Sequence, residues 1–345
     1  MRSGIAALLL LCITFFPGCA RRTPTLYIYC NETFWYVMQE EAFVFSRAYG
    51  FRVVLIPIRA SRTEDEAEET IEINGNRRAA PATWLSMPGE RTTPVVEPHT
   101  QIHPDIDRQI EKIAEERLGD LFLSDSQRQA EKLHQAGLSM SDVLVCYLTL
   151  TMLVPTGNPH HFGSVRDVLE SSRRLGIVDP VLDGLGEASW TVLGRIVPGG
   201  ESAIPMELVQ LYERQYDLLE ALEQRQIDAA LVWNATSQRN FLLVKYADEY
   251  NTDPRFVGYL REAERQRNQN AMRLVLREMS ETLFEERRFA EEVALTENPD
   301  ERLVVAARLI VLSSTSNHGF SKRFADFIRS NQGREILRRF GFVAQ

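Results

Sequence analysis

The stretch TLYIYCNETFWYVMQEEAFVFSRAYGFRVVLIPI, residues 25–58, decides the fold class. Residues 25–29 are rich in aromatic and branched side chains and predict a strand. Apolar residues then recur at helical spacing over 31–50, with Gly50 as the expected stop. Residues 51–58 predict a second strand. A strand, a helix long enough to cross over and another strand together predict a βαβ unit, and therefore a parallel sheet.

The chain before this unit predicts an export signal. Ile5–Phe16 is apolar apart from one threonine and follows a basic residue. It is too short for a membrane span, which needs about 20 apolar residues, and it fits a secretory signal over residues 1–18. Phe16-Pro17-Gly18-Cys19 also resembles a bacterial lipobox, which implies a lipidated Cys19 followed by a linker over 19–23. An ordinary signal peptide with an incidental cysteine is the alternative.

Composition places the chain among exported globular proteins and excludes one class of partner. The 345 residues are 44% hydrophobic and 25% charged, and the length suggests two domains. The formal charge of −9 argues against nucleic acid, which selects basic surfaces. A small anion is still compatible with this charge, because backbone N–H groups and hydroxyls can hold it.

Cysteine and histidine spacing predicts neither a metal site nor a cofactor site. After export, Cys30 and Cys146 would remain beside Cys19. Export permits a disulfide between them, and two buried thiols in neighbouring strands are the alternative. No Cys/His spacing is typical of zinc, no Gly-rich phosphate loop is present, and no nucleophile motif indicates an enzyme.

Farther along the chain, helices and strands continue to alternate. Residues 62–105 have no sustained period and predict an insertion loop. Residues 142–155 predict a long apolar strand that could run from one domain into another. Ser164 is the expected cap of a following helix. Residues 206–226 and 256–292 both predict helices.

Several segments, in order, resemble the molybdate-binding branch of bacterial periplasmic solute-binding proteins. Residues 25–61 are similar to that family's first βαβ unit with its Ala-Ser turn, and GDLFLSDS (119–126) is similar to its "aDvfiSAd" strand and turn. LTMLVPTGNP (150–159), DLLEALEQRQIDAALVWNATS (217–237) and residues 308–342 resemble later family segments. The likeness spans most of the mature chain except residues 62–105 and about 241–301.

The resemblance implies an α/β, two-lobe type 2 periplasmic binding fold. Each lobe would be a parallel-dominated sheet flanked by helices, with a ligand cleft between the lobes. The implied division is lobe 1 over 24–150 with insertion 62–105, lobe 2 over 151–304 with insertion 241–301, and a return to lobe 1 over 305–345.

The resemblance also implies the ligand-binding positions of the first lobe. The family's first anion-contacting serine falls on Thr33, beside Asn31, and either residue could instead simply cap the helix. The second serine falls on Ser61, preceded by Ala60. Arg59 could bind an anion through two parallel hydrogen bonds or merely begin the loop.

The second lobe departs further from the family pattern. Its donor turn falls on Asp183, Gly184 and Leu185, where a backbone N–H would be offered but Asp183 would repel a bound anion. The family's tyrosine falls on Trp233, whose indole N–H donates but cannot accept. Asn234 follows where arginine or glycine is common.

These residues support one function and two alternatives. The first is a substrate-binding lipoprotein of an ABC importer, a monomer in the periplasm or at the cell surface, that captures a molybdate- or tungstate-like oxyanion. The second is the same scaffold binding ferric iron or a small organic ligand through residues such as Asp183. The third is an envelope protein-interaction module that has lost transport. The expected partners are the small ligand, a permease and, through Cys19, a lipid membrane.

Overall fold

The computed structural model describes the strand–helix–strand unit and most of the chain after it. The described residues are 24–58, 69–73, 76–80, 110, 113, 119–234, 237–239, 241–242, 245–246, 278, 281–296 and 303–344. The predicted signal, Cys19 and the segment Arg59–Ser61 lie outside them. So does most of the predicted insertion 241–301.

The opening unit forms as its sequence predicts. β1 (Thr25–Cys30) and β2 (Arg52–Pro57) pair in parallel from Thr25 opposite Arg52 onward. A short 3-10 turn (Glu32–Phe34) leads into α2 (Trp35–Tyr49) between them. Gly50 ends α2 in the left-handed conformation, with φ of 71°, which glycine adopts without steric cost.

A nine-stranded sheet continues from this unit through the whole fold. Its order is β2-β1-β5-β11-β6-β9-β7-β8, and β10 also pairs with β6. The remaining strands of this sheet are β5 (Leu121–Ser124), β6 (Ser139–Pro155), β7 (Leu175–Val178), β8 (Val209–Tyr212), β9 (Ala229–Trp233), β10 (Ala290–Val293) and β11 (Val304–Leu312).

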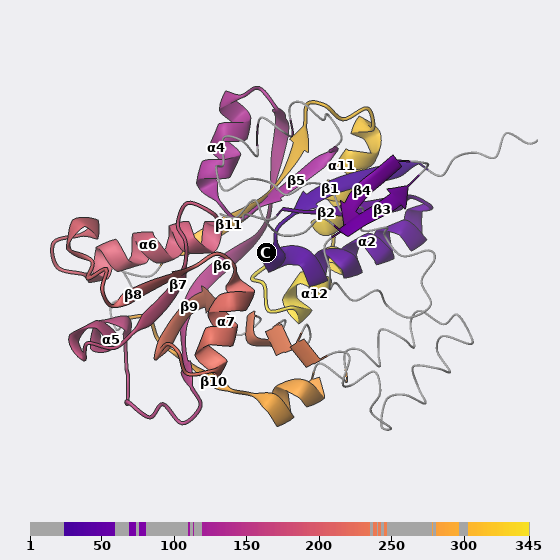
Figure 1. The fold of residues 1–345 in the computed structure, drawn as a ribbon. Coiled ribbons are helices and arrows are strands. Elements are labelled where there is room, and N and C mark those ends of the chain that lie inside the picture. The colour runs from indigo at the N-terminus through magenta and orange to yellow at the C-terminus, as the bar shows by residue number, and fades with distance from the viewer. Residues whose placement is uncertain are drawn as a thin grey trace, which may run out of the picture.

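β6 belongs to both halves of the molecule. Its first part, Ser139–Thr149, pairs antiparallel with β11, and Leu150–Leu153 pairs with β9. Figure 1 shows β6 crossing the centre, with β1, β2 and β5 on one side and β7, β8 and β9 on the other. The result is a two-lobe α/β fold in which the lobes share one long strand. We call the half with β1, β2, β5 and β11 the first lobe and the half with β7–β10 the second lobe.

Helices cover both lobes. α2 packs against α11 and α12 on one face of the first lobe, while the buried side chains of α4 join a separate cluster on the opposite face. α6 and α7 pack on β7 and β9 of the second lobe (Figure 1). The helices after α2 whose bounds the structure defines are α4 (Gln127–Gln135), α5 (Val165–Glu170), α6 (Gly184–Ile196), α7 (Gln215–Glu223), α11 (His318–Ile328) and α12 (Asn331–Arg339). None of the described helices is long and apolar enough to cross a membrane.

Two predicted helical stretches each contain a strand in addition to a helix. Within 206–226, Val209–Tyr212 forms β8 and pairs in parallel with β7, and α7 begins only at Gln215. Within 256–292, residues 281–287 are helical as predicted, and the stretch then ends in β10, which pairs antiparallel with β6. β8 and β10 form for the same reason. Each is a four-residue segment beside a sheet, where its backbone N–H and C=O groups find hydrogen-bond partners that they would lack at a helix end.

The predicted insertion loop 62–105 is also not wholly irregular. β3 (Glu69–Ile73) and β4 (Asn76–Ala80) pair as a separate two-stranded antiparallel sheet. The sequence between them is Asn74-Gly75, which is a strong hairpin signal, whereas the lack of a sustained period predicted only a loop.

Cys30 and Cys146 are buried free thiols. They lie in β1 and β6, which β5 and β11 separate, so they are not in neighbouring strands. Three strand spacings of about 4.8 Å exceed the Cα separation of about 4.4–6.8 Å that a disulfide spans. The sheet order therefore keeps these two cysteines apart.

Candidate anion-binding site

The polar centre of the molecule is the carboxylate of Asp125. Asp125 follows directly after β5 and precedes Ser126, the residue that caps α4. Only 1% of its surface is exposed. A buried carboxylate is costly unless hydrogen bonds compensate its lost hydration, so its partners define what this position is built to hold.

Three side-chain donors from two lobes converge on Asp125. In the first lobe, Asn31 donates through Nδ2 to Oδ1 at 2.7 Å, and Thr33 donates through Oγ1 to Oδ2 at 3.2 Å. From the second lobe, the indole Nε1 of Trp233 donates to Oδ2 at 3.2 Å. All four side chains are buried. The structure thus places a negative group at the centre of a donor set that spans both lobes.

Strand ends explain why these donors meet. Asn31 and Thr33 follow the carboxyl end of β1, Asp125 follows that of the parallel neighbour β5, and Trp233 is the last residue of β9. The parallel strands β1 and β5 end at one edge, where open α/β folds bind ligands. β9 runs the opposite way, so its carboxyl end faces theirs along β6. The topology therefore builds the convergence.

Burial and hydrogen bonding act on Asp125 in opposite directions. Burial raises the pKa of Asp125, while the bonds from Asn31, Thr33 and Trp233 counteract part of the rise by stabilising the charged form. Burial also raises the pKa of the nearby Cys146 thiol, and the negative charge of Asp125 raises it further.

The start of α6 closes one side of this centre. Gly184 begins α6, and a Cβ placed on it would meet Asp125 Oδ1 at 2.5 Å and the Asp125 carbonyl carbon at 2.8 Å. Only a glycine allows the second lobe to approach Asp125 this closely. Asp183 caps the helix, since its Oδ1 accepts from the backbone N–H of Leu185 at 2.8 Å.

A second contact joins the lobes beside Asp125. Ser126 donates through Oγ to Glu187 Oε2 of α6 at 2.6 Å. The same Ser126 oxygen accepts from the backbone N–H of Gln129, which is its capping role in α4. Asp125 and Ser126 together therefore link the β5–α4 turn of one lobe to the first turn of α6 in the other.

The structure brings together four of the residues that the sequence singled out. Asn31, Thr33, Gly184 and Trp233 all contact Asp125 or approach it. Asp183 and Leu185 pair with each other in the cap of α6, and Asn234 donates through Nδ2 to the carbonyl oxygen of Gly341 at 2.8 Å. Arg59, Ala60 and Ser61 lie outside the described residues.

Asp125 itself was missed at the sequence level. The signal was present, because the family pattern "aDvfiSAd" has alanine where GDLFLSDS has Asp125. A carboxylate in place of a methyl group, in the turn after a central strand, is the departure that matters most for this site.

One acceptor in the centre remains unused. The side-chain oxygen of Asn31 is buried and has no hydrogen-bond partner among the described residues. A buried polar atom without a partner is destabilising and rare, and a functional role is one explanation for it. Within the described part of the chain, no group of three or more His, Cys, Asp or Glu side chains could hold a metal ion.

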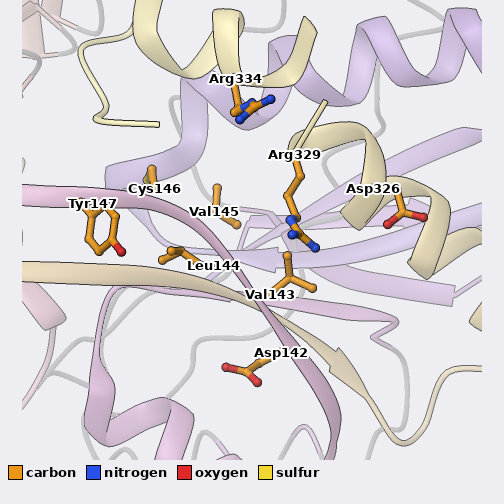
Figure 2. Close-up of a pocket in the computed structure, with 9 residues that line it drawn as sticks. All are labelled: Asp142, Val143, Leu144, Val145, Cys146, Tyr147, Asp326, Arg329 and Arg334. Carbon is orange, nitrogen blue, oxygen red and sulfur yellow. The ribbon is translucent and has the colours of Figure 1, made fainter. Parts of the chain in front are cut away.

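A separate cavity lies along β6 in the first lobe. It has a volume of about 630 Å³ and lies between β6 residues 142–147 and the α11–α12 connection. Figure 2 shows Arg329 reaching toward Val143 within it, with Arg334 above. None of the donors to Asp125 lines this cavity, so it is distinct from the interlobe centre.

Comparison with known proteins places this geometry in a family. The sequence profile of the bacterial extracellular solute-binding proteins matches residues 105–343, well over half of the chain. The chain belongs to the bacterial extracellular solute-binding protein family. Membership in this extracellular family implies an exported protein that binds a small solute. No curated protein matches the sequence significantly.

Solved structures share the two-lobe fold of this solute-binding protein. The periplasmic molybdate-binding protein of Azotobacter vinelandii is 11% identical, with 93% of this chain and 99% of that chain covered and a TM-score of 0.52. The sulfate-binding protein SubI of Mycobacterium tuberculosis is 12% identical, with 92% and 86% covered and a TM-score of 0.54. Iron-bound HitA of Pseudomonas aeruginosa is 14% identical, with 91% and 84% covered and a TM-score of 0.54. These likenesses establish the fold, while the ligands named belong to those proteins.

Proposed function

We propose that this solute-binding protein captures a small oxyanion between its lobes and delivers it to an ABC importer. The observation that carries the proposal is the convergence of donors from both lobes on one buried carboxylate. A carboxylate is itself a small oxyanion, so the contacts made to Asp125 display the hydrogen bonding that a bound oxyanion would receive.

The chemistry of the donors favours an anion over a cation. The amide Nδ2 of Asn31, the hydroxyl of Thr33 and the indole N–H of Trp233 all direct hydrogen atoms at the site. An indole nitrogen has no lone pair to offer a metal ion. Hydrogen bonds to a charged acceptor contribute about 1.5–3 kcal/mol each. Such donors stabilise a tetrahedral oxyanion such as molybdate, tungstate, sulfate or phosphate.

Closure of the two lobes is the expected capture step. Trp233 comes from β9 in the second lobe, while Asn31 and Thr33 come from the first, so a ligand held by all three ties the lobes together. Solute-binding folds close by hinge motion around their ligand. β6, shared by both lobes, is the connection that such a hinge would bend.

The best test removes one hydrogen bond and keeps the aromatic ring. Trp233→Phe deletes the indole N–H that faces the site. Because this N–H is bonded to Asp125 before an oxyanion takes it over, we expect oxyanion affinity to fall by less than the roughly 10- to 100-fold that a bond to a charged acceptor contributes. Trp190→Phe is the matched control, because the Trp190 indole donates to Glu201 Oε2 in the second lobe and away from Asp125. Calorimetric titration would measure the oxyanion affinity of both variants, and equal affinities would contradict the proposal.

A second test addresses the first lobe. We expect Thr33→Ala combined with Ser61→Ala to weaken oxyanion binding, because both hydroxyls are proposed donors. Unchanged affinity in the double variant would remove both hydroxyls from the site.

We also propose that Cys19 carries a lipid that anchors the exported protein to a membrane. The support is the position of Gly18-Cys19 directly after the apolar stretch. Cys19→Ser should release the protein from the membrane fraction and abolish incorporation of labelled fatty acid. Retention of the label would show that another residue is modified.

A further inference from the structure

We propose that Asp125 is a built-in competitor for the ligand, a carboxylate that occupies the oxyanion position and must leave before the ligand can bind. This inference rests on the proposed function. It adds a residue that sets affinity, and it makes binding an exchange of one anion for another.

The first support is the complete use of the donor set. Asn31 donates to Oδ1 of Asp125, and Thr33 and Trp233 both donate to Oδ2, so both carboxylate oxygens are hydrogen-bonded. Each of these donors has one partner oxygen at 2.7–3.2 Å, and that oxygen belongs to the protein. A ligand that used the same hydrogen atoms would have to take them from Asp125.

The second support is electrostatic. Asp125 is fully buried, and an oxyanion at hydrogen-bond distance from the same donors would lie within a few ångströms of its charge. Like charges at that distance in a site shielded from water repel strongly. The carboxylate and the oxyanion therefore exclude each other from this position as long as both carry a charge.

The third support is the close packing of Gly184 on Asp125. The space beside Oδ1 would not admit even a methyl group at position 184. The Ser126–Glu187 hydrogen bond at 2.6 Å holds the same two segments together. Asp125 can swing out only when the start of α6 moves away, so its departure is coupled to separation of the lobes.

This coupling gives Asp125 two effects of opposite sign. In the closed form it satisfies three buried donors and so stabilises the protein without ligand. In binding it lowers apparent affinity, because only the fraction of molecules with Asp125 displaced can accept the ligand. A residue with a purely structural role would produce the first effect without the second.

The experiment compares two buried aspartates that flank the same strand. Asp120 immediately precedes β5 and Asp125 immediately follows it. Asp120 is also buried, and it accepts hydrogen bonds from the Tyr27 backbone and the Thr315 hydroxyl in the first lobe. Asp125→Ala is the test variant and Asp120→Ala is its control. Molybdate, sulfate and phosphate would each be titrated calorimetrically into the wild type and both variants, with melting temperatures measured without ligand.

We expect both variants to melt below the wild type, and only Asp125→Ala to bind its oxyanion at least tenfold more tightly. Asp125→Asn keeps the shape of the side chain and removes its charge, so it should fold well and show intermediate affinity. If Asp125→Ala does not fold, Asp125→Asn takes its place as the test variant in the affinity measurement.

The outcomes separate this inference from the proposed function. If the wild type binds an oxyanion and Asp125→Ala and Asp125→Asn bind it no more tightly, the competitor role is wrong and the oxyanion function stands. If no form of the protein binds any of the three anions, both proposals are wrong.

Discussion

Glu41 is a buried acid that has no part in the proposed site. It lies on α2 with none of its surface exposed, and both carboxyl oxygens lack hydrogen-bond partners among the described residues. Burial raises its pKa from 4.5 to about 9, and the charge of Arg339 opposes the rise only in part. Glu41 is therefore protonated in the folded protein at neutral pH.

This shift makes stability depend on pH in a defined direction. Since the folded pKa lies above the unfolded one, the folded chain retains a proton between pH 4.5 and about 9 that the unfolded chain has released. The stabilisation is complete below pH 4.5 and is lost as the pH rises through this window, by about 1.4 kcal/mol per pH unit. Glu41→Gln should remove this pH dependence of the free energy of unfolding, because glutamine does not titrate. Urea unfolding of wild type and variant at several pH values measures it, and a constant difference in stability would contradict the assignment.

At the level of single residues, the sequence predicted much of the site but not its centre. Thr33, Asn31 and Trp233 were placed by resemblance, and the structure brings them together. Asp125 was not found, because neither periodicity nor composition shows where the side chain of a turn residue points. Its role depends on Trp233, which is 108 positions away in the chain.

Among the elements, the start of α6 is predicted to be sensitive to a single methyl group. Gly184→Ala would place Cβ against Asp125, and overpacking of this kind costs about 1–3 kcal/mol. Because the strain falls between the lobes, we expect a lower melting temperature and weaker closure on the ligand. Thermal unfolding and oxyanion titration measure the two effects.

Gly319→Ala is the matched control in another helix. Gly319 lies in the first turn of α11, and a Cβ there meets nothing within 4 Å. Replacing a helical glycine by alanine stabilises by up to about 1 kcal/mol. If Gly184→Ala were as well tolerated as Gly319→Ala, the close packing of the two lobes at Asp125 would be wrong.

Long elements were predictable from sequence and short ones were not. α2 and β6 follow from sustained periodicity and from an unbroken apolar run. β8 was predicted as helix, because Val209–Tyr212 adjoins a strongly helical segment and four residues are too few to show a strand period. This segment becomes a strand because it pairs with β7, and only the tertiary fold brings that partner beside it.

For the molecule as a whole, we predict that the two buried thiols become reactive only when the shared sheet unfolds. Cys30 in β1 and Cys146 in β6 are buried, and burial raises the pKa of each thiol, which keeps both protonated and unreactive. We expect alkylation of both to be slow in native protein and fast in urea, as site-resolved mass spectrometry would show. Rapid native labelling of Cys146 alone would instead reveal opening near Asp125.

The most direct test of the account is thermal unfolding of the purified protein against a panel of molybdate, tungstate, sulfate, phosphate and ferric iron. A ligand at about 100 times its dissociation constant adds about 2.7 kcal/mol to the stability of a protein that binds it only when folded. The account predicts that at least one oxyanion raises the melting temperature by several degrees and that Trp233→Phe reduces the shift. A shift with ferric iron alone, or none with any oxyanion, would contradict the claim that the lobes close around an anion.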